Sequence, residues 1–211
     1  MASWSRREFL KFAGVTIAAT VLKPTPPEEH ALGRPTGFGR VTNSSVWTYN
    51  NPQPGAEQVK AYYRDDVLPI YDTVSAEGLA PYNPIWNLTN NGWIYSAWIQ
   101  PVQKLINPVV RSVPSTGFWA EVSVPYTEMR IEANDLARKL YRLYYGSVHL
   151  VTAHVTDPSG QSWYQIKDDQ VPTRQEFVPA EFLRPIPPAE MTPISPDVVD
   201  KRLEVNLKDQ I

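Results

Sequence analysis

The sequence predicts a mainly β protein: two small, partly open β-barrels in tandem, with a helix before them and an isolated strand after them. Three observations favour this fold class. Short segments rich in Val, Tyr, Trp and Ile are separated by Pro, Asn, Gly and Asp, which is typical of short strands joined by turns. This pattern occurs twice along the chain. Each copy is short, and a barrel is the form that protects most strand edges in so small a unit.

The N-terminal segment, residues 1–22, has the organisation of a secretory signal peptide, with a basic start and a short apolar run. The run is too short for a membrane span, which needs about 20 apolar residues. The basic motif resembles the twin-arginine export signal at each of its positions, which here are Arg6, Arg7, Phe9, Leu10 and Lys11. We therefore expect export by the twin-arginine translocase to an extracellular, periplasmic or cell-wall location. No clean cleavage site follows, so an uncleaved signal that anchors the protein in the membrane is the alternative.

Composition divides the rest of the chain into barrels and Pro-rich connections. Prolines cluster before the first barrel and after the second, as in extended linkers and semi-rigid spacers. The last residues alternate cleanly between polar and apolar side chains, which indicates a half-buried strand. The predicted segments after the signal peptide are a linker at 23–38, a first barrel domain at 39–104, a second at 118–186, a spacer at 187–200 and a strand at 201–211.

The turn and strand patterns place the elements of the two barrels. The tripeptide Asn90-Asn91-Gly92 predicts a hairpin, because Asn-Gly supplies the positive φ that a type I′ turn requires. In the segment 128–145 the apolar residues recur at helical spacing, and we expect a short helix or a few turns there. The expected strands are 39–46, 67–72, 85–88 and 93–96 in the first barrel, and 121–125, 147–155, 163–166 and 176–178 in the second.

The two copies can be laid over each other at three blocks of similar sequence. The offset between the copies differs slightly from block to block, as insertions in turns would cause. The overlay places Trp86 and Trp163 at equivalent positions, and we expect both in barrel cores. The first residues of the matching blocks are Val67 with Val148, Trp86 with Trp163, and Trp98 with Phe182.

The composition excludes several kinds of site. The chain has no cysteine, so it has no disulfide, no thiolate metal site and no cysteine nucleophile. A net charge of −2 gives no reason to expect nucleic acid as a partner. His149 and His154 stand on one expected strand at an odd spacing, which points them to opposite faces. We therefore expect no metal and no cofactor.

Carboxylates and aromatic rings are the remaining candidates for chemistry. Glycoside hydrolysis by a carboxylate pair, Glu121 with Glu128 or Asp65 with Asp66, needs a deep cleft that small barrels rarely provide. Aromatic rings crowd both barrels, and some of them must lie outside such small cores. Exposed rings suit glycan or peptide binding, because they offer flat apolar area with polar edges. The candidates for binding are Tyr49, Tyr62, Tyr63, Tyr144 and Tyr145.

The terminal strand, residues 202–210, reads Arg-Leu-Glu-Val-Asn-Leu-Lys-Asp-Gln. With this strand, the export signal and the two barrels, the chain resembles the N-terminal part of bacterial L,D-transpeptidases, which cross-link peptidoglycan with a YkuD-type catalytic domain. The resemblance implies that the barrels are SH3-like domains that contact the cell wall or the catalytic domain. It also implies that the terminal strand opens a catalytic domain truncated here. No catalytic residue carries over, because the family's Cys motif has no counterpart in this sequence.

The expected function is therefore the targeting or binding part of an exported L,D-transpeptidase. Its expected partners are peptidoglycan or a wall glycopeptide, the twin-arginine translocase and the missing catalytic domain. We expect no transpeptidase activity from this chain alone, because the family's acyl-enzyme forms on a cysteine. A free-standing exported SH3-like binding module without enzymatic activity is the alternative.

Overall fold

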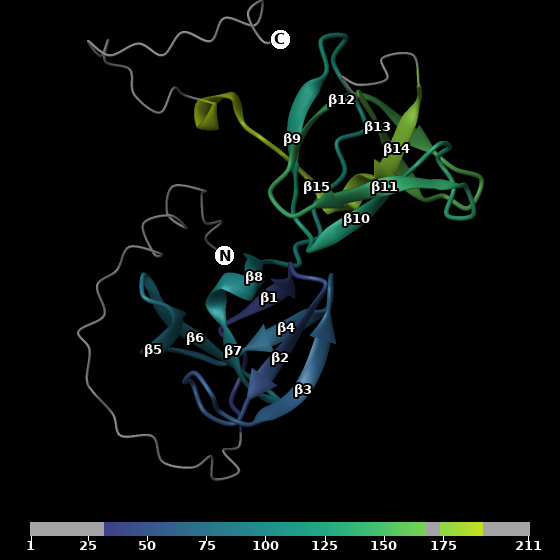
Figure 1. The fold of residues 1–211 in the computed structure, drawn as a ribbon. Coiled ribbons are helices and arrows are strands. Elements are labelled where there is room, and N and C mark those ends of the chain that lie inside the picture. Colours follow the sequence, from purple (N-terminus) through teal and green to yellow (C-terminus); the bar gives the residue numbers. More distant parts are fainter. Residues whose placement is uncertain (1–31, 168–173, 192–211) are drawn as a thin grey trace, which may run out of the picture. The chain divides into compact units, whose positions relative to one another are not determined.

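The computed structural model describes residues 32–167 and 174–191, which are mainly β, as the sequence predicts. The chain divides into two compact units (Figure 1), unit 1 ending at Val102 and unit 2 beginning at Gln103. Three antiparallel sheets form in the described part of the chain, and none of them is closed. The predicted export signal and the predicted terminal strand lie outside the described residues.

Unit 1 contains two sheets. One has the strand order β4-β1-β8 and the other has the order β3-β2-β7-β6-β5. A 3-10 turn, η1 (Ser96–Trp98), lies directly before the last strand. The strands are β1 (Gly37–Val41), β2 (Ser45–Tyr49), β3 (Gln58–Tyr63), β4 (Val67–Ile70), β5 (Asp72–Ala80), β6 (Asn83–Thr89), β7 (Gly92–Tyr95) and β8 (Ile99–Val102).

Unit 2 contains one sheet with the strand order β11-β10-β14-β13-β12-β9-β15. Its last strand also follows a 3-10 turn, η2 (Ala180–Phe182), and a further turn, η3 (Pro188–Glu190), comes after it. The strands are β9 (Phe118–Val122), β10 (Tyr126–Arg130), β11 (Lys139–Tyr144), β12 (Val148–Thr156), β13 (Ser162–Lys167), β14 (Glu176–Pro179) and β15 (Leu183–Pro185).

Both units follow the same pairing order. Only Tyr71 separates β4 from β5, and when these two are taken together as the counterpart of β12, each strand pair of unit 1 has an equivalent in unit 2. Trp86 pairs with the last residue of β7, and Trp163 pairs with the last residue of β14. A 3-10 turn follows in each unit and ends at Trp98 or at Phe182. The pairing therefore agrees with the repeat that the sequence predicts.

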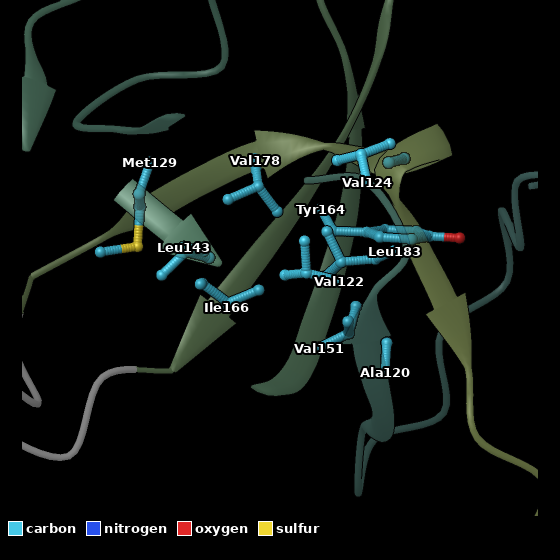
Figure 2. Close-up of a cluster of buried hydrophobic side chains, with 11 residues drawn as sticks. Ala120, Val122, Val124, Met129, Leu143, Val151, Tyr164, Ile166, Val178 and Leu183 are labelled. Carbon is cyan, nitrogen blue, oxygen red and sulfur yellow. The ribbon is translucent and has the colours of Figure 1, made fainter. Parts of the chain in front are cut away.

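Each unit has its own buried core. The strands bury alternate residues, as in β10, where Thr127 and Met129 face inward. Trp86 and Trp163 are both fully shielded from solvent, which confirms their predicted place in the cores. The main cluster of unit 1 comprises Val41, Val46, Tyr62, Leu68, Ile70, Ile94 and Ile99. The main cluster of unit 2 (Figure 2) comprises Ala120, Val122, Val124, Met129, Leu143, Val151, Tyr164, Ile166, Val178, Ala180 and Leu183.

Of the two forms expected within 128–145, the short helix is wrong, and the turns occupy only the middle of the segment. This segment forms the hairpin of β10 and β11 instead, with a series of turns between the strands. Leu136, which fitted the helical spacing, is 94% exposed. The side-chain oxygen of Asn134 accepts a hydrogen bond from the Leu136 N–H at 2.8 Å, so it closes a turn and does not cap a helix.

The hairpin predicted at Asn90-Asn91-Gly92 is confirmed, since β6 and β7 pair from Thr89 and Gly92 outward. The predicted turn type is wrong. A type I′ turn needs positive φ at both central residues, whereas in this turn only Gly92, with φ 96°, is positive. The Thr89 hydroxyl accepts from the Asn91 N–H at 3.1 Å and donates to the Gly92 carbonyl at 2.8 Å, which stabilises the alternative turn.

Candidate functional site

Strands β2 and β10 occupy the same place in the two units and end on chemically different residues. Tyr49, the last residue of β2, pairs with Trp93 of β7. Arg130, the last residue of β10, pairs with Phe177 of β14. Trp93 and Phe177 each stand two residues before the end of their strands. Tyr49 and Arg130 are therefore equivalent positions on the two scaffolds.

In unit 1 this position belongs to a cluster of four rings. The ring of Tyr49 stands edge-on to Trp86, with the two centroids 5.9 Å apart. The ring of Tyr95 lies 5.1 Å from Trp86 and 5.6 Å from Trp98, and the centroids of Tyr49 and Trp98 are 6.2 Å apart. The indole N–H of Trp86 donates to the Glu77 carbonyl at 3.0 Å, so this buried donor is satisfied. Rings thus fill this part of unit 1.

In unit 2 a pocket lies at the equivalent place. The positions of the four rings are taken by Arg130, Trp163, Pro179 and Phe182, so two of the rings are lost. The cavity has a volume of about 230 Å³, room for several groups the size of a water molecule. Its lining residues include Tyr126, Glu128, Arg130, Asp135, Pro179 and Phe182.

The charges around the pocket are unevenly paired. Arg130 donates from Nη1 to the Ala137 carbonyl at 2.7 Å, while its Nε is shielded from solvent and has no hydrogen-bond partner. Glu128 lies 2.9 Å from Arg142 Nε and 3.5 Å from Lys139 Nζ. The charge of Glu128 is therefore balanced by the neighbouring strand, and no ion pair of Arg130 forms within the described residues.

The five predicted binding tyrosines are distributed over both units. Tyr49, Tyr62 and Tyr63 stand on β2 and β3 of unit 1, while Tyr144 ends β11 of unit 2 and Tyr145 follows it. Tyr63 is 62% exposed, and Tyr49, Tyr144 and Tyr145 are half-buried. Tyr62 is 7% exposed, because its ring packs into the core cluster of unit 1. A role of these rings in wall binding stays a prediction.

A second exposed ring, Trp47, stands beside Tyr63 on the outer face of the β2–β3 hairpin. Trp47 is 40% exposed. It pairs with Ala61, while Tyr63 pairs with Ser45, so the two rings are diagonal neighbours on one face. Trp47 is not among the rings predicted to bind, although its neighbours in β2, Val46 and Thr48, are buried and this alternation places its ring outside.

The histidines of β12 lie on the same face, contrary to the prediction from their spacing. A bulge inserts the extra residue Thr152 into the strand, which reverses the alternation between the two. His149 pairs with Ala120 and His154 pairs with Tyr164, and both partners belong to the core. Among residues 32–167 and 174–191, no group of His, Asp and Glu has the arrangement that a metal ion needs.

The surroundings of His154 favour the neutral form of its imidazole. Burial lowers the pKa of its imidazole, and the nearby charge of Arg111 lowers this pKa further. Its Nε2 atom is shielded from solvent without a hydrogen-bond partner. Its ring centroid lies 6.2 Å from that of Tyr164.

The predicted carboxylate candidates connect strands and turns within each unit. Glu121 accepts a hydrogen bond from Arg184 Nε at 2.8 Å. Asp65 accepts one from Arg40 Nη1 at 2.6 Å, in a pair whose side chains are almost fully buried. Glu128 is engaged by Arg142, as described above. The fourth candidate, Asp66, accepts a hydrogen bond from the Tyr63 N–H at 2.8 Å. These partners give each of the four carboxylates a structural role.

No protein-family model matches this chain, and comparison with curated proteins finds no match. In the part of the chain that the structure describes, no helix has the length and apolar character needed to cross a membrane.

Proposed function

We propose that this chain is the exported N-terminal part of an L,D-transpeptidase-type protein, and that two SH3-like barrels in it bind peptidoglycan or a wall glycopeptide. The export signal at Arg6 and Arg7 and the terminal strand at 202–210 support the first half of the proposal. The two units support the second half.

The course of one strand in each unit supports barrels over flat sheets. Small barrels turn their corners with strands that bend or bulge from one sheet into the next. In unit 1 the chain passes from β4 to β5 with a break at Tyr71, and these strands belong to different sheets. In unit 2 the long strand β12 has its bulge at Thr152. Both features are what a partly open barrel requires.

The observation that carries the binding role is the exposed ring pair Trp47 and Tyr63. Large rings that keep this much exposed area side by side on a sheet suit stacking on sugars. Unit 2 offers a different surface, the pocket at Arg130. The two units therefore provide two kinds of contact for a polymer that contains both sugars and peptides.

Co-sedimentation of the purified full chain with isolated bacterial cell walls tests the binding role. We expect saturable binding, and roughly tenfold weaker binding when Trp47→Ala and Tyr63→Ala are combined, because stacked rings contribute about 0.5–1.5 kcal/mol each. Tyr82→Ala is the matched control, since Tyr82 is an 88% exposed ring elsewhere on unit 1. Absence of binding by the parent chain, or equal binding by the double variant, would contradict the proposal.

Replacement of Arg6 and Arg7 by Lys tests export. The double variant keeps the positive charge, so a general requirement for a basic start is still met. We expect it to accumulate in the cytoplasm, with cell fractionation as the readout. Normal export of this variant would show that the twin-arginine translocase is not used.

The alternative is a free-standing exported SH3-like binding module. Sequencing the gene beyond the codon for Ile211 separates the two proposals. An open frame that encodes a motif with His, Gly and a nucleophilic Cys supports the transpeptidase, whereas a stop codon supports the module.

A further inference from the structure

The pocket of unit 2 is the place where the two units differ most in chemistry. Its equivalent in unit 1 is filled by the ring of Tyr49 against Trp86 and Trp98. At the position of Tyr49, unit 2 has Arg130, which lines a cavity of about 230 Å³. Since the backbone pairing at this point is the same, the difference lies in the side chains alone.

The guanidinium of Arg130 is poorly satisfied within the protein. A guanidinium carries five N–H donors, and within the described residues Arg130 donates from Nη1 to the Ala137 carbonyl. The Nε–H is shielded from solvent and unpartnered. An unsatisfied buried donor normally destabilises a fold, so a ligand that accepts from Arg130 would gain a strong, charge-assisted hydrogen bond.

An acidic side chain without an ion pair lines the same pocket. Asp135 stands in the turn between β10 and β11, and within the described residues it has no cationic partner. Glu128, the other carboxylate of the lining, is already engaged by Arg142 and Lys139. The pocket therefore presents one available cation and one available anion. Phe182 and Pro179 add apolar wall on which a small side chain can pack.

We propose that this pocket binds a free amino acid or a peptide side chain that ends in an amino-acid group, with a carboxylate and an ammonium on the same carbon. The carboxylate accepts from the guanidinium of Arg130, and the ammonium lies toward Asp135. This inference rests on the proposed function, because it names the part of a wall peptide that unit 2 would recognise. It requires no contact with the exposed rings of unit 1.

Three small probes separate the contributions of the two charges. Alanine carries both charges, N-acetylalanine carries only the carboxylate, and alaninamide carries only the ammonium. In a ¹H–¹⁵N NMR titration of the full chain, we expect alanine to shift the signals of Arg130, Phe182 and their neighbours saturably. N-acetylalanine and alaninamide should each bind at least about tenfold more weakly, since each loses one charged contact.

Substitutions of Arg130 and Asp135 test which side chain contacts which charge of alanine. Arg130→Gln should weaken alanine binding at least about tenfold, and Arg130→Tyr should abolish it by restoring the ring of unit 1. Asp135→Asn lies at an exposed turn, where it does not disturb the core, and should make alanine bind no better than N-acetylalanine. Dispersed spectra of all three variants will show that the fold is intact.

Three results would overturn the inference: no saturable shift with alanine, unchanged binding by Arg130→Gln in a folded protein, or equal binding of alanine and alaninamide. If alanine fails while the chain still sediments with cell walls through Trp47 and Tyr63, the proposed function stands and only this inference fails. If alanine binds but walls do not, the proposed function fails and the pocket remains an amino-acid site.

Discussion

In each unit a side-chain hydrogen bond from an arginine, here called the bridge, joins the first and last strands. The arginine stands on the first strand in unit 1 and on the last strand in unit 2. In unit 1, Arg40 on β1 donates from Nε to Gln100 on β8 at 3.2 Å. In unit 2, Arg184 on the last strand, β15, donates from Nε to Glu121 on the first strand, β9, at 2.8 Å. The residues of each bridge are cross-strand partners at the same point of the sheet. The pairing geometry is thus independent of which strand carries the cation.

The turn before β4 and before β12 gives a second comparison. Asp65 and Gly146 both have the left-handed backbone conformation, with φ of 74° and 77°. Their N–H groups donate to Val41 and Val122, at 3.0 and 2.9 Å. Glycine adopts this conformation without strain, whereas Asp65 is held in it by its ion pair with Arg40. Equivalent turns therefore depend on different interactions, and different variants should break them.

The largest losses of stability are expected from substitution of the core tryptophans, which occupy equivalent buried positions in the two units. Trp86→Ala and Trp163→Ala should each lower the stability of the affected unit by about 3–5 kcal/mol, because both remove a fully buried ring. Thermal unfolding followed by circular dichroism measures this loss. Tyr82→Ala, at a ring that is 88% exposed, is the control and should leave the melting curve almost unchanged. Melting curves of both core variants that match the parent would refute the equivalence.

The cores and the repeat could be predicted because they depend on alternation and on tryptophans that recur in both copies. The hairpin of β10 and β11 could not, since Leu136, Leu140 and Leu143 match a helical period, whereas Leu136 lies in the turn and the other two lie on β11. The face of His154 could not be predicted either, because a bulge at Thr152 leaves no sequence signal. The pocket depends on two strands and a 3-10 turn that meet at Arg130, and the importance of this residue emerges only from comparison with Tyr49.

A smaller effect should distinguish the two bridges. Arg40→Met leaves the Asp65 carboxylate buried without its cation and should lower the stability of unit 1 by about 3 kcal/mol. Arg184→Met removes a more exposed pair in unit 2 and should cost about 1 kcal/mol. Urea unfolding of both variants measures the difference. Equal losses would show that burial of the bridge does not determine its contribution.

A still smaller loss of stability is expected from the turn before β12. Gly146→Ala places a Cβ on a residue with φ 77° and should cost about 1–2 kcal/mol. Gly146→Asn is the matched variant, because Asn tolerates this conformation better than Ala, and it should lose less. Urea unfolding that ranks Ala as equal to or better than Asn would contradict this account of the turn.

The smallest effect concerns pH and should arise in unit 2. At the position of His154, unit 1 has Thr73, which hydrogen-bonds to Asn87 and does not titrate. Burial and Arg111 lower the pKa of His154 in the folded state, so the unfolded chain takes up this proton first, near the ordinary pKa of about 6.5. The stabilising contribution of the neutral imidazole is then complete above that pH and is lost as the pH falls toward the lower folded pKa. His154→Leu should therefore make stability fall less steeply with decreasing pH below about 6.5, as measured by urea unfolding across that range.

His149 remains in both proteins, so the difference between the two curves reports His154 alone. Thr73→Leu should leave the slope as it is in the parent. Parallel curves for His154→Leu and the parent would mean that the imidazole takes up its proton equally well in the folded protein.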